Sequence, residues 1–266
     1  MDKLIRVRIV AVSCDLYSDC APAWEYLFRT HWPECLYPLC FVTNSEPLSV
    51  QSPVHYIKGK DIDYGGRMRR FIKAHCHPDD VLLLTMADYM LKHVDVGLVE
   101  RAISLMRKDS GVWHIRLRPM PPPRLPYSDD FGGIDKTSRY ALSLQSGLWR
   151  ASTAYNLFRD GENPWDTEQN GSGRVKGMKG SFLSVRTMAM PHINYYNKRS
   201  VLPGSISWVR NRVPKELWPD ACRDSSLART KVPGNRRGPS TGPSTRPSTG
   251  SGQSSGRGKK GRRKRG

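Results

Sequence analysis

The 266-residue sequence lacks several patterns that would assign it to a class at once. No apolar run approaches the roughly 20 residues needed to cross a membrane, and the first residues lack the basic and apolar regions of a secretory signal. The six cysteines form no C-x-x-C pair, so we expect no structural zinc site. Neither a Walker loop nor a dinucleotide-binding glycine pattern is present. These absences favour a cytoplasmic protein with free thiols.

Acidic residues are scarce beside basic ones: 24 Asp and Glu stand against 43 Lys and Arg, a formal charge of +19. Residues 223–266 hold 13 of the bases and one acid, and they repeat the triplet Pro-Ser-Thr. This segment has too few apolar residues for a core, so we expect a disordered basic tail after a domain of residues 1–222. The tail favours a tether for DNA or another polyanion, while a solubilising or localisation role stays open.

Strand patterns alternate with helical ones along the first 160 residues. We expect strands at residues 5–12, 39–43, 54–57, 81–85, 112–117 and 140–144, and helices at 23–29, 67–74, 98–108 and 148–158. This alternation predicts a single α/β domain with a mostly parallel central sheet and helices on both faces. Ligands of such sheets bind at the carboxyl ends of the strands, where Asp15, Asn44 and Asp88 each follow a strand.

Seven segments, taken in order, resemble small bacterial and phage glycosyltransferases of the GT-A fold, some of which modify DNA. They lie between residues 7 and 197 and read V-S-C-D-L-Y-S-D, F-V-T-N, G-G-R-M-R-R, V-L-L-L-T-M-A-D-Y-M-L, Y-A-L-S-L-Q-S-G-L-W-R, N-P-W-D-T-E and P-H-I-N-Y-Y-N. The resemblance implies transfer of a sugar, with a hexose favoured, from a nucleotide-sugar, with a UDP-sugar favoured, to an acceptor hydroxyl. A fold hosts many functions, so the resemblance names neither substrate.

The earlier segments carry the residues expected to bind the donor. Ser13 and Asp15 lie in the loop after the first strand, where Asp15 suits either a ribose or base edge or the cap of the next segment. Asn44 follows the second strand. Arg67 and Arg70 stand three residues apart after a pair of glycines and would share a helix face, as a diphosphate clamp needs; an exposed basic helix is the alternative.

Asp88 ends the apolar run 81–87, where many enzymes of this fold carry an Asp-x-Asp pair for Mg²⁺ or Mn²⁺. Here the positions two residues away are Met86 and Met90, so the pair is absent. One carboxylate still suits a metal held mostly by phosphate and water, and a metal-independent enzyme that relies on cations is equally compatible. His192 is a second candidate ligand for the metal or the diphosphate, as a late histidine is in some relatives.

The segment Asn163–Glu168 combines an aromatic with two carboxylates and suits acceptor chemistry. Trp165 offers a flat face for a sugar or a base. Asp166 or Glu168 is expected to take the acceptor proton in an inverting attack, with Asp166 slightly favoured because it follows the tryptophan. The same residues suit a helix start, and the two interpretations are compatible. Further acceptor contacts are expected at a strand-to-helix junction, although Trp149 also suits a core: Gln145, Trp149 and Arg150.

Three functions stay open from the sequence. The favoured one transfers the sugar to 5-hydroxymethylcytosine, or another hydroxymethyl pyrimidine, in phage DNA. The basic tail, the charge of +7 on residues 1–222 and the stretches 136–140 and 173–180 would hold that DNA. The second acceptor is a surface polysaccharide or lipid-linked glycan, and the third function is that of an inactive domain that binds nucleic acid. The oligomeric state and the stereochemical outcome do not follow from the sequence.

Overall fold

The computed structural model describes residues 5–197, 200–224 and 226–227. The chain divides into a unit of Met1–Val232 and a unit of Pro233–Gly266, and all the described residues belong to the first. The basic tail expected at residues 223–266 lies outside the described residues except for its first few positions, so the domain boundary and the tether stay predictions. Within the described part of the chain, no helix combines the length and apolar character needed to span a bilayer. The cytoplasmic location also stays a prediction.

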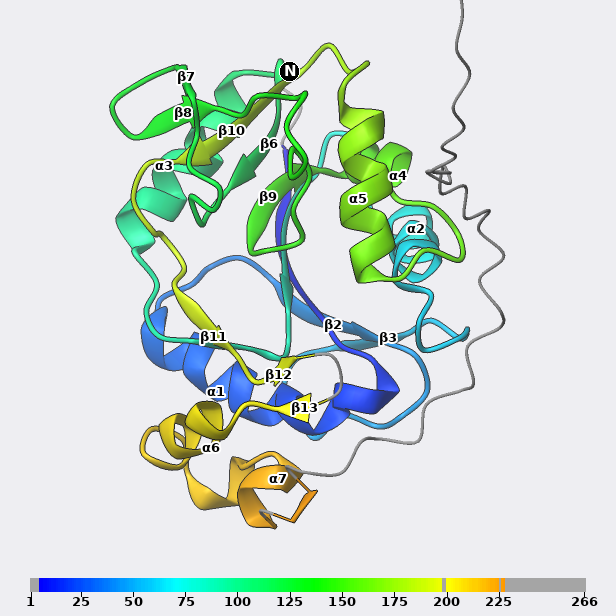
Figure 1. The fold of residues 1–266 in the computed structure, drawn as a ribbon, viewed down its shortest axis with the longest axis vertical. Helices are drawn as coiled ribbons and strands as arrows, with labels where there is room; N and C mark the ends of the chain where they lie inside the picture. The colour runs from blue at the N-terminus through cyan, green and yellow to red at the C-terminus, as the bar shows by residue number, and fades with distance from the viewer. Residues whose placement is uncertain (1–4, 198–199, 225, 228–266) are drawn as a thin grey trace, which may run out of the picture. The chain divides into compact units, whose positions relative to one another are not determined.

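A nine-stranded sheet lies at the centre of the described residues, in the order β3-β2-β1-β4-β9-β6-β10-β8-β7 (Figure 1). Strands β9 and β8 run opposite to the others, so the prediction of a mostly parallel sheet is confirmed. The strands are β1 (Val7–Val12), β2 (Leu39–Thr43), β3 (Val54–Tyr56), β4 (Val81–Met86), β6 (Val112–Arg116), β7 (Leu125–Pro126), β8 (Phe131–Gly133), β9 (Gly147–Arg150) and β10 (Ser181–Val185).

Helices cover both faces of the sheet, as expected for strands that are apolar on both sides (Figure 1). On β1, Ile9 faces one core and Val10 the other, because successive side chains of a strand point to opposite faces. The first core packs against α1 (Ala21–His31) and α3 (Val96–Lys108). The second packs against α2 (Tyr64–His75), α4 (Ala151–Leu157) and α5 (Pro164–Val175). The α/β fold class is therefore confirmed.

Helix starts follow the local sequence closely. The side chain of Asp63 accepts a hydrogen bond from the Gly66 N–H at the start of α2, and Asn163 caps α5 through the Asp166 N–H. Pro164 stands in the first turn of α5, where its missing N–H leaves no bond unmade. The expected helix start in the segment 163–168 is confirmed.

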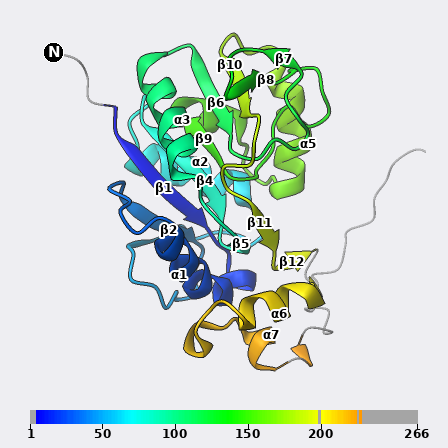
Figure 2. The same ribbon diagram turned by 90° about the vertical axis from the view of Figure 1, so that its left-hand side faces the viewer.

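Late parts of the chain return to the end of β4. Strand β5 (Tyr89–Leu91) pairs with β11 (His192–Asn194), which brings His192 opposite Leu91 (Figure 2). The remaining elements are η1 (Asp15–Cys20), β12 (Tyr196–Asn197), β13 (Ser200–Val201), α6 (Pro203–Arg210), η2 (Lys215–Leu217) and α7 (Asp220–Arg223). The β5–β11 pair therefore joins two segments about a hundred residues apart beside one edge of the central sheet.

The expected strand at 140–144 and helix at 148–158 are wrong in their boundaries. Residues 140–146 form no strand, β9 occupies Gly147–Arg150, and α4 begins at Ala151. Strand β9 lies between β4 and β6, and a Cβ atom at Gly147 would stand 2.9 Å from the His114 ring. The short strand β9 depends on this close approach to β6. The pattern of apolar residues in the sequence gives no sign of such a contact between distant segments.

Candidate active site

The loops after β1 and β2 are tied together by Asp15. Its Oδ1 atom accepts hydrogen bonds from the backbone N–H groups of Ser45 at 2.8 Å and Glu46 at 2.9 Å, and its Oδ2 atom accepts one from the Ser45 hydroxyl. Partial burial opposes ionisation, yet these bonds leave the pKa of Asp15 below its usual value. The carboxylate thus ties the loop after β1 to the turn after β2. It does not cap the segment that follows it, because no side-chain hydrogen bond caps η1, and the expected contact with the donor stays a prediction. Beside it, Asn44 is buried and its Oδ1 atom has no hydrogen-bond partner among the described residues.

Arg67 is buried behind these loops, with 2% of its surface exposed. Its guanidinium donates to the carbonyl oxygens of Ser13 and Asp61, each at 2.6 Å, and burial lowers its pKa. Arg70 instead extends to Asp63, 3.3 Å away, with its side chain 44% exposed. The two arginines therefore make separate contacts on the same loop, residues 61–63, and the diphosphate clamp stays a prediction.

Asp88 lies in the turn between β4 and β5, half-buried. Its backbone carbonyl accepts a hydrogen bond from the Tyr195 N–H at 2.8 Å. Burial raises the pKa of its carboxyl to about 7; a bond from its own backbone N–H lowers it and the nearby Asp19 carboxylate raises it further. Among the described residues, no side chain forms a salt bridge with Asp88. The strand therefore delivers to the carboxyl edge of the sheet an acid that has no cationic partner among the described residues.

His192 stacks on Tyr89, with ring centroids 4.2 Å apart and an interplanar angle of 3°. Its Nε2 atom accepts a hydrogen bond from Nη1 of Arg118 at 3.0 Å. Burial, and then the charge of Arg118, lower the pKa of His192 to about 3, so the ring is neutral at physiological pH. The Nε2 lone pair is thus already used by the arginine.

The side chains at this edge do not fit a metal held by the protein. No three His, Cys, Asp or Glu residues in the described part of the chain form a ligand cluster. Asp88 has one further carboxylate nearby, that of Asp19, whose Oδ2 atom already accepts from Tyr196, whereas protein sites for Mg²⁺ or Mn²⁺ use several oxygens. We therefore derive no catalytic step through a metal, and the roles of Asp88 and His192 as ligands stay predictions.

The carboxylate of Glu168 points from α5 to the loop that precedes β9. Its Oε1 atom accepts hydrogen bonds from the Leu144 N–H at 2.7 Å and from the Ser143 hydroxyl at 3.0 Å. Asp166 is exposed and contacts the capping residue Asn163, and Trp165 beside it is 49% exposed. Of the two candidate bases, Glu168 is thus the one held against the core of the fold.

The phenol of Tyr89 is influenced by both carboxylates. Its phenol lies within electrostatic reach of both Asp88 and Glu168, and also of Tyr64 and Arg118. Burial, followed by the two carboxylates, raises the pKa of the phenol well above its ordinary value. One carboxylate from the β4–β5 turn and one from α5 therefore act electrostatically on the same phenol.

The three acceptor contacts expected at residues 145–150 separate in the structure. Because β9 runs antiparallel to β4, Gly147 lies opposite Leu84 while Arg150 lies opposite Val81, at the start of β4. Only the beginning of β9 thus reaches the carboxyl edge. There Gln145 is half-buried, and its Oε1 atom has no hydrogen-bond partner among the described residues.

Trp149 and Arg150 lie away from this edge. Trp149 is 1% exposed and stacks on His114, with ring centroids 3.7 Å apart. Arg150 is buried and donates to the carbonyl oxygens of Met106, Asp109 and Val112. An acceptor contact by either residue would require unpacking the core or the end of α3. We therefore correct the expected acceptor set to Gln145 and Trp165 and leave these two residues out.

Two arginines that sequence reasoning missed lie at the end of β6: Arg116 is its last residue, and Arg118 comes two residues later. Arg116 is fully buried and donates to the carbonyl oxygens of Pro121 and Tyr140, and burial lowers its pKa to about 10 because it disfavours the charge. Arg118 is half-buried and contacts His192. The signal was the alternation H-I-R-L-R, which places charges at the end of an apolar strand just as the run before Asp88 does.

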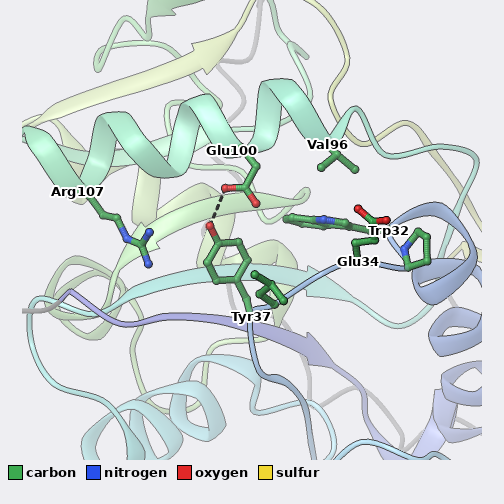
Figure 3. A pocket seen from close by; sticks show the side chains of 8 residues that line it. Trp32, Glu34, Tyr37, Val96, Glu100 and Arg107 are labelled. Atoms are coloured by element: carbon green, nitrogen blue, oxygen red, sulfur yellow. Dashed lines mark hydrogen bonds between the residues drawn. The ribbon is translucent and has the colours of Figure 1, made fainter.

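A hollow of about 690 Å³ lies elsewhere, between the end of α1 and α3 (Figure 3). The Tyr37 hydroxyl donates to the Glu100 carboxylate across it at 2.6 Å. Its lining contains none of the predicted site residues: Trp32, Pro33, Glu34, Leu36, Tyr37, Val96, Glu100 and Arg107. The candidate active site is therefore defined by side chains at the sheet edge and not by this hollow.

No family model matches the chain, and no curated protein matches its sequence. Several solved structures are similar to it at low identity. A mannosyltransferase from Pyrobaculum calidifontis in complex with GDP-Man and Mn²⁺ is 11% identical, covers 82% of this chain and 64% of its own, and has a TM-score of 0.46.

S. aureus TarS 1-349 is 9% identical over 70% of this chain and 59% of its own, with a TM-score of 0.43. A mycobacterial protein is 9% identical over 71% and 68%, with a TM-score of 0.44. The chain thus spans less than two thirds of the length of TarS and of the mannosyltransferase. At these scores the likenesses carry no argument about the site, which has to be argued from its own geometry.

Proposed function

We propose that the protein transfers a sugar from a nucleotide-sugar to an acceptor hydroxyl at the carboxyl edge of its sheet. The observation that carries this proposal is that Asp88 follows β4 at the carboxyl edge and that α5 holds Glu168 against the loop before β9, with both carboxylates acting electrostatically on Tyr89. Neither carboxylate forms a salt bridge with a described residue, so both keep oxygens available to substrates. Two carboxylates supplied by different elements, the β4–β5 turn and α5, suit a reaction with one donor and one acceptor.

The donor is expected on the side of β1 and β2. Ser13 and Asp15 shape the first loop, and the unpartnered Oδ1 atom of Asn44 can accept a hydrogen bond from a base or ribose. Arg67 holds this loop through the Ser13 carbonyl, while the exposed Arg70 pairs with Asp63 beside it. A nucleoside diphosphate sugar, with UDP favoured, would place its phosphates toward Asp88.

Glu168 is the proposed general base. As the acceptor oxygen attacks the anomeric carbon, Glu168 takes the hydroxyl proton, the new C–O bond forms, and the bond to the diphosphate breaks with the electron pair leaving on phosphate oxygen. Trp165 stands three residues before Glu168 on α5, so the two share a helix face. Its exposed ring suits the stacking of a sugar or a base close to the proton acceptor.

The favoured acceptor is a hydroxymethyl pyrimidine in DNA, with 5-hydroxymethylcytosine first. Support comes from the two basic stretches, because the Lys136 ammonium donates to the Met178 carbonyl at 2.7 Å and so joins them. In the same region Arg139 lies over the ring of Tyr140, with the guanidinium carbon 5.4 Å from the ring centroid, and Tyr140 is exposed. Cations interleaved with an exposed aromatic suit a strand of nucleic acid.

A donor and acceptor panel tests this function. The full chain is incubated with UDP-, GDP-, ADP- and dTDP-sugars together with DNA containing hydroxymethylcytosine, and digested nucleosides are weighed by mass spectrometry. A hexose increment on the modified base supports the whole proposal. Transfer only to a glycan acceptor contradicts the DNA acceptor. DNA binding with neither transfer nor donor hydrolysis contradicts the enzyme itself and favours a binding domain.

A further inference from the structure

Arg118 is a cation without an anionic partner. It forms no salt bridge with any described residue, although it lies at the end of β6 in a half-buried position. Its Nε atom is buried and has no hydrogen-bond partner in the described part of the chain. Buried cations in folded proteins are normally paired, because removal from water is costly. The unpaired guanidinium therefore indicates a site for an anion.

The orientation of Arg118 is fixed from one side. Its Nη1 atom donates to Nε2 of His192 at 3.0 Å, and the imidazole is held flat against Tyr89. Tyr89 and His192 belong to the paired strands β5 and β11, so a small sheet supports the stack. Because Nη1 is committed to the imidazole, the guanidinium keeps its Nε–Nη2 edge for a ligand. That edge has the two parallel N–H groups that match two oxygens of a phosphate.

We propose that Arg118 binds the donor diphosphate through this edge and stabilises the charge that grows on the leaving nucleoside diphosphate. His192 and Tyr89 act as positioning residues. The inference rests on the proposed function for the identity of the anion, and on the geometry alone for the presence of an anion site. In this proposal a guanidinium neutralises the negative charge of the diphosphate. The described side chains around Asp88 form no ligand cluster that would hold a metal ion for the same task.

The phosphate could come from the donor or from the DNA backbone, and binding measurements separate the two. Calorimetry on the full chain compares uridine, UMP and UDP, with the guanosine series in parallel, in the presence of EDTA. In the wild type we expect the affinity to rise from nucleoside to diphosphate. Arg118→Gln should lose most of that rise, on the order of tenfold or more for the removal of a charge-assisted hydrogen-bond pair, while uridine affinity stays the same. Arg118→Lys should recover part of it.

Several outcomes overturn the inference. One is an equal loss of affinity for uridine and UDP in Arg118→Gln, and another is an unchanged affinity for both. A third is a loss of affinity for DNA alone, because it would assign the phosphate to the acceptor. A wild type that binds no nucleoside diphosphate also overturns it. Circular dichroism of each variant shows that it is folded. Arg124→Gln, an exposed cation in the same loop, is the matched control and should leave the ratio of UDP to uridine affinity unchanged.

Variants of His192 test the positioning role. His192→Gln keeps a hydrogen-bond acceptor for Arg118 and should retain part of the diphosphate preference, whereas His192→Leu should lose it. Equal ratios in the two variants contradict the role. The result is separable from the proposed function. Diphosphate binding that depends on Arg118 without any sugar transfer contradicts the function and keeps the site. Sugar transfer together with a diphosphate affinity that does not depend on Arg118 supports the function and contradicts the anion site.

Discussion

The Oε1 atom of Glu168 accepts a hydrogen bond from the backbone N–H of Leu144 at 2.7 Å. This bond fixes the second turn of α5 against the loop before β9, and the Ser172 hydroxyl repeats the attachment one turn later at Leu142. The proposed base is thus held by main chain on one oxygen and keeps the other for substrate. Its placement depends on how closely α5 approaches residues 141–146.

Alanine substitutions at two glycines of α5 test how closely this helix approaches residues 141–146. A Cβ atom at Gly171 would stand 2.6 Å from the Cδ1 atom of the fully buried Leu142, whereas nothing lies within 4 Å of one at Gly173. Gly173→Ala should therefore raise the free energy of unfolding by up to about 1 kcal/mol, the usual gain in helix propensity. Gly171→Ala gains the same propensity but should be net destabilising, because overpacking costs about 1–3 kcal/mol. Chemical denaturation of both variants measures this, and equal stabilisation contradicts the close approach.

Asp88 should make stability depend on pH. Its folded pKa is about 7, against about 4 in an unfolded chain, so the folded state binds the proton more tightly. The stabilising contribution of the protonated carboxyl is complete below about pH 4 and is lost as the pH rises to about 7. Asp88→Asn keeps a neutral group throughout. Relative to the wild type it should gain stability steadily across this window, and a constant difference between the two would show that the carboxyl is not perturbed.

Replacing Trp165, at the site, and Trp149, in the core, should affect different properties of the protein. Trp165→Ala should weaken acceptor binding by the roughly 1–3 kcal/mol that base stacking on an aromatic supplies, with little change in stability because the ring is 49% exposed. Trp149→Ala should lower the free energy of unfolding by roughly 3–5 kcal/mol because its ring fills the core. Acceptor KM and denaturation midpoints separate the two effects. A normal acceptor KM in Trp165→Ala removes that residue from the site.

The basic stretches should contribute to the salt dependence of DNA binding. Replacing three of their cations by glutamine should reduce the slope of log affinity against log salt by roughly 0.9 for each phosphate that is no longer neutralised: Arg139, Lys176 and Lys179. A matched control replaces three exposed lysines on other elements: Lys73, Lys108 and Lys215. Fluorescence anisotropy over a salt series gives both slopes. Identical slopes for the two triple variants would show that residues 136–140 and 173–180 do not bind the phosphates.

Much of the donor side could be predicted from the sequence. Asp15, Asn44 and Asp88 each follow an apolar strand, and parallel strands that end together bring such residues to one edge. The helix start at Asn163 could also be predicted, because a capping bond joins residues only three positions apart in the sequence. These features rest on local pattern or on the direction of parallel strands.

The rest of the site depends on contacts that are distant in sequence. Arg118 meets His192 across 74 positions, so neither residue alone suggested the pair. Asp166 was slightly favoured over Glu168 because it follows Trp165, and the sequence does not tell which side of α5 docks on residues 141–146. The short run Gly147–Arg150 gave no sign of its direction, and its reversal moved Arg150 to the far end of β4.

Replacing Glu168 by glutamine tests the central claim most directly. Glutamine keeps an acceptor oxygen for the Leu144 N–H and Ser143 hydroxyl, so the fold and donor affinity should persist, but it cannot take a proton. We predict that Glu168→Gln lowers kcat for sugar transfer by about 10²–10⁴-fold while Asp166→Asn keeps most of it. A wild-type kcat in Glu168→Gln, or a loss confined to Asp166→Asn, would contradict the account.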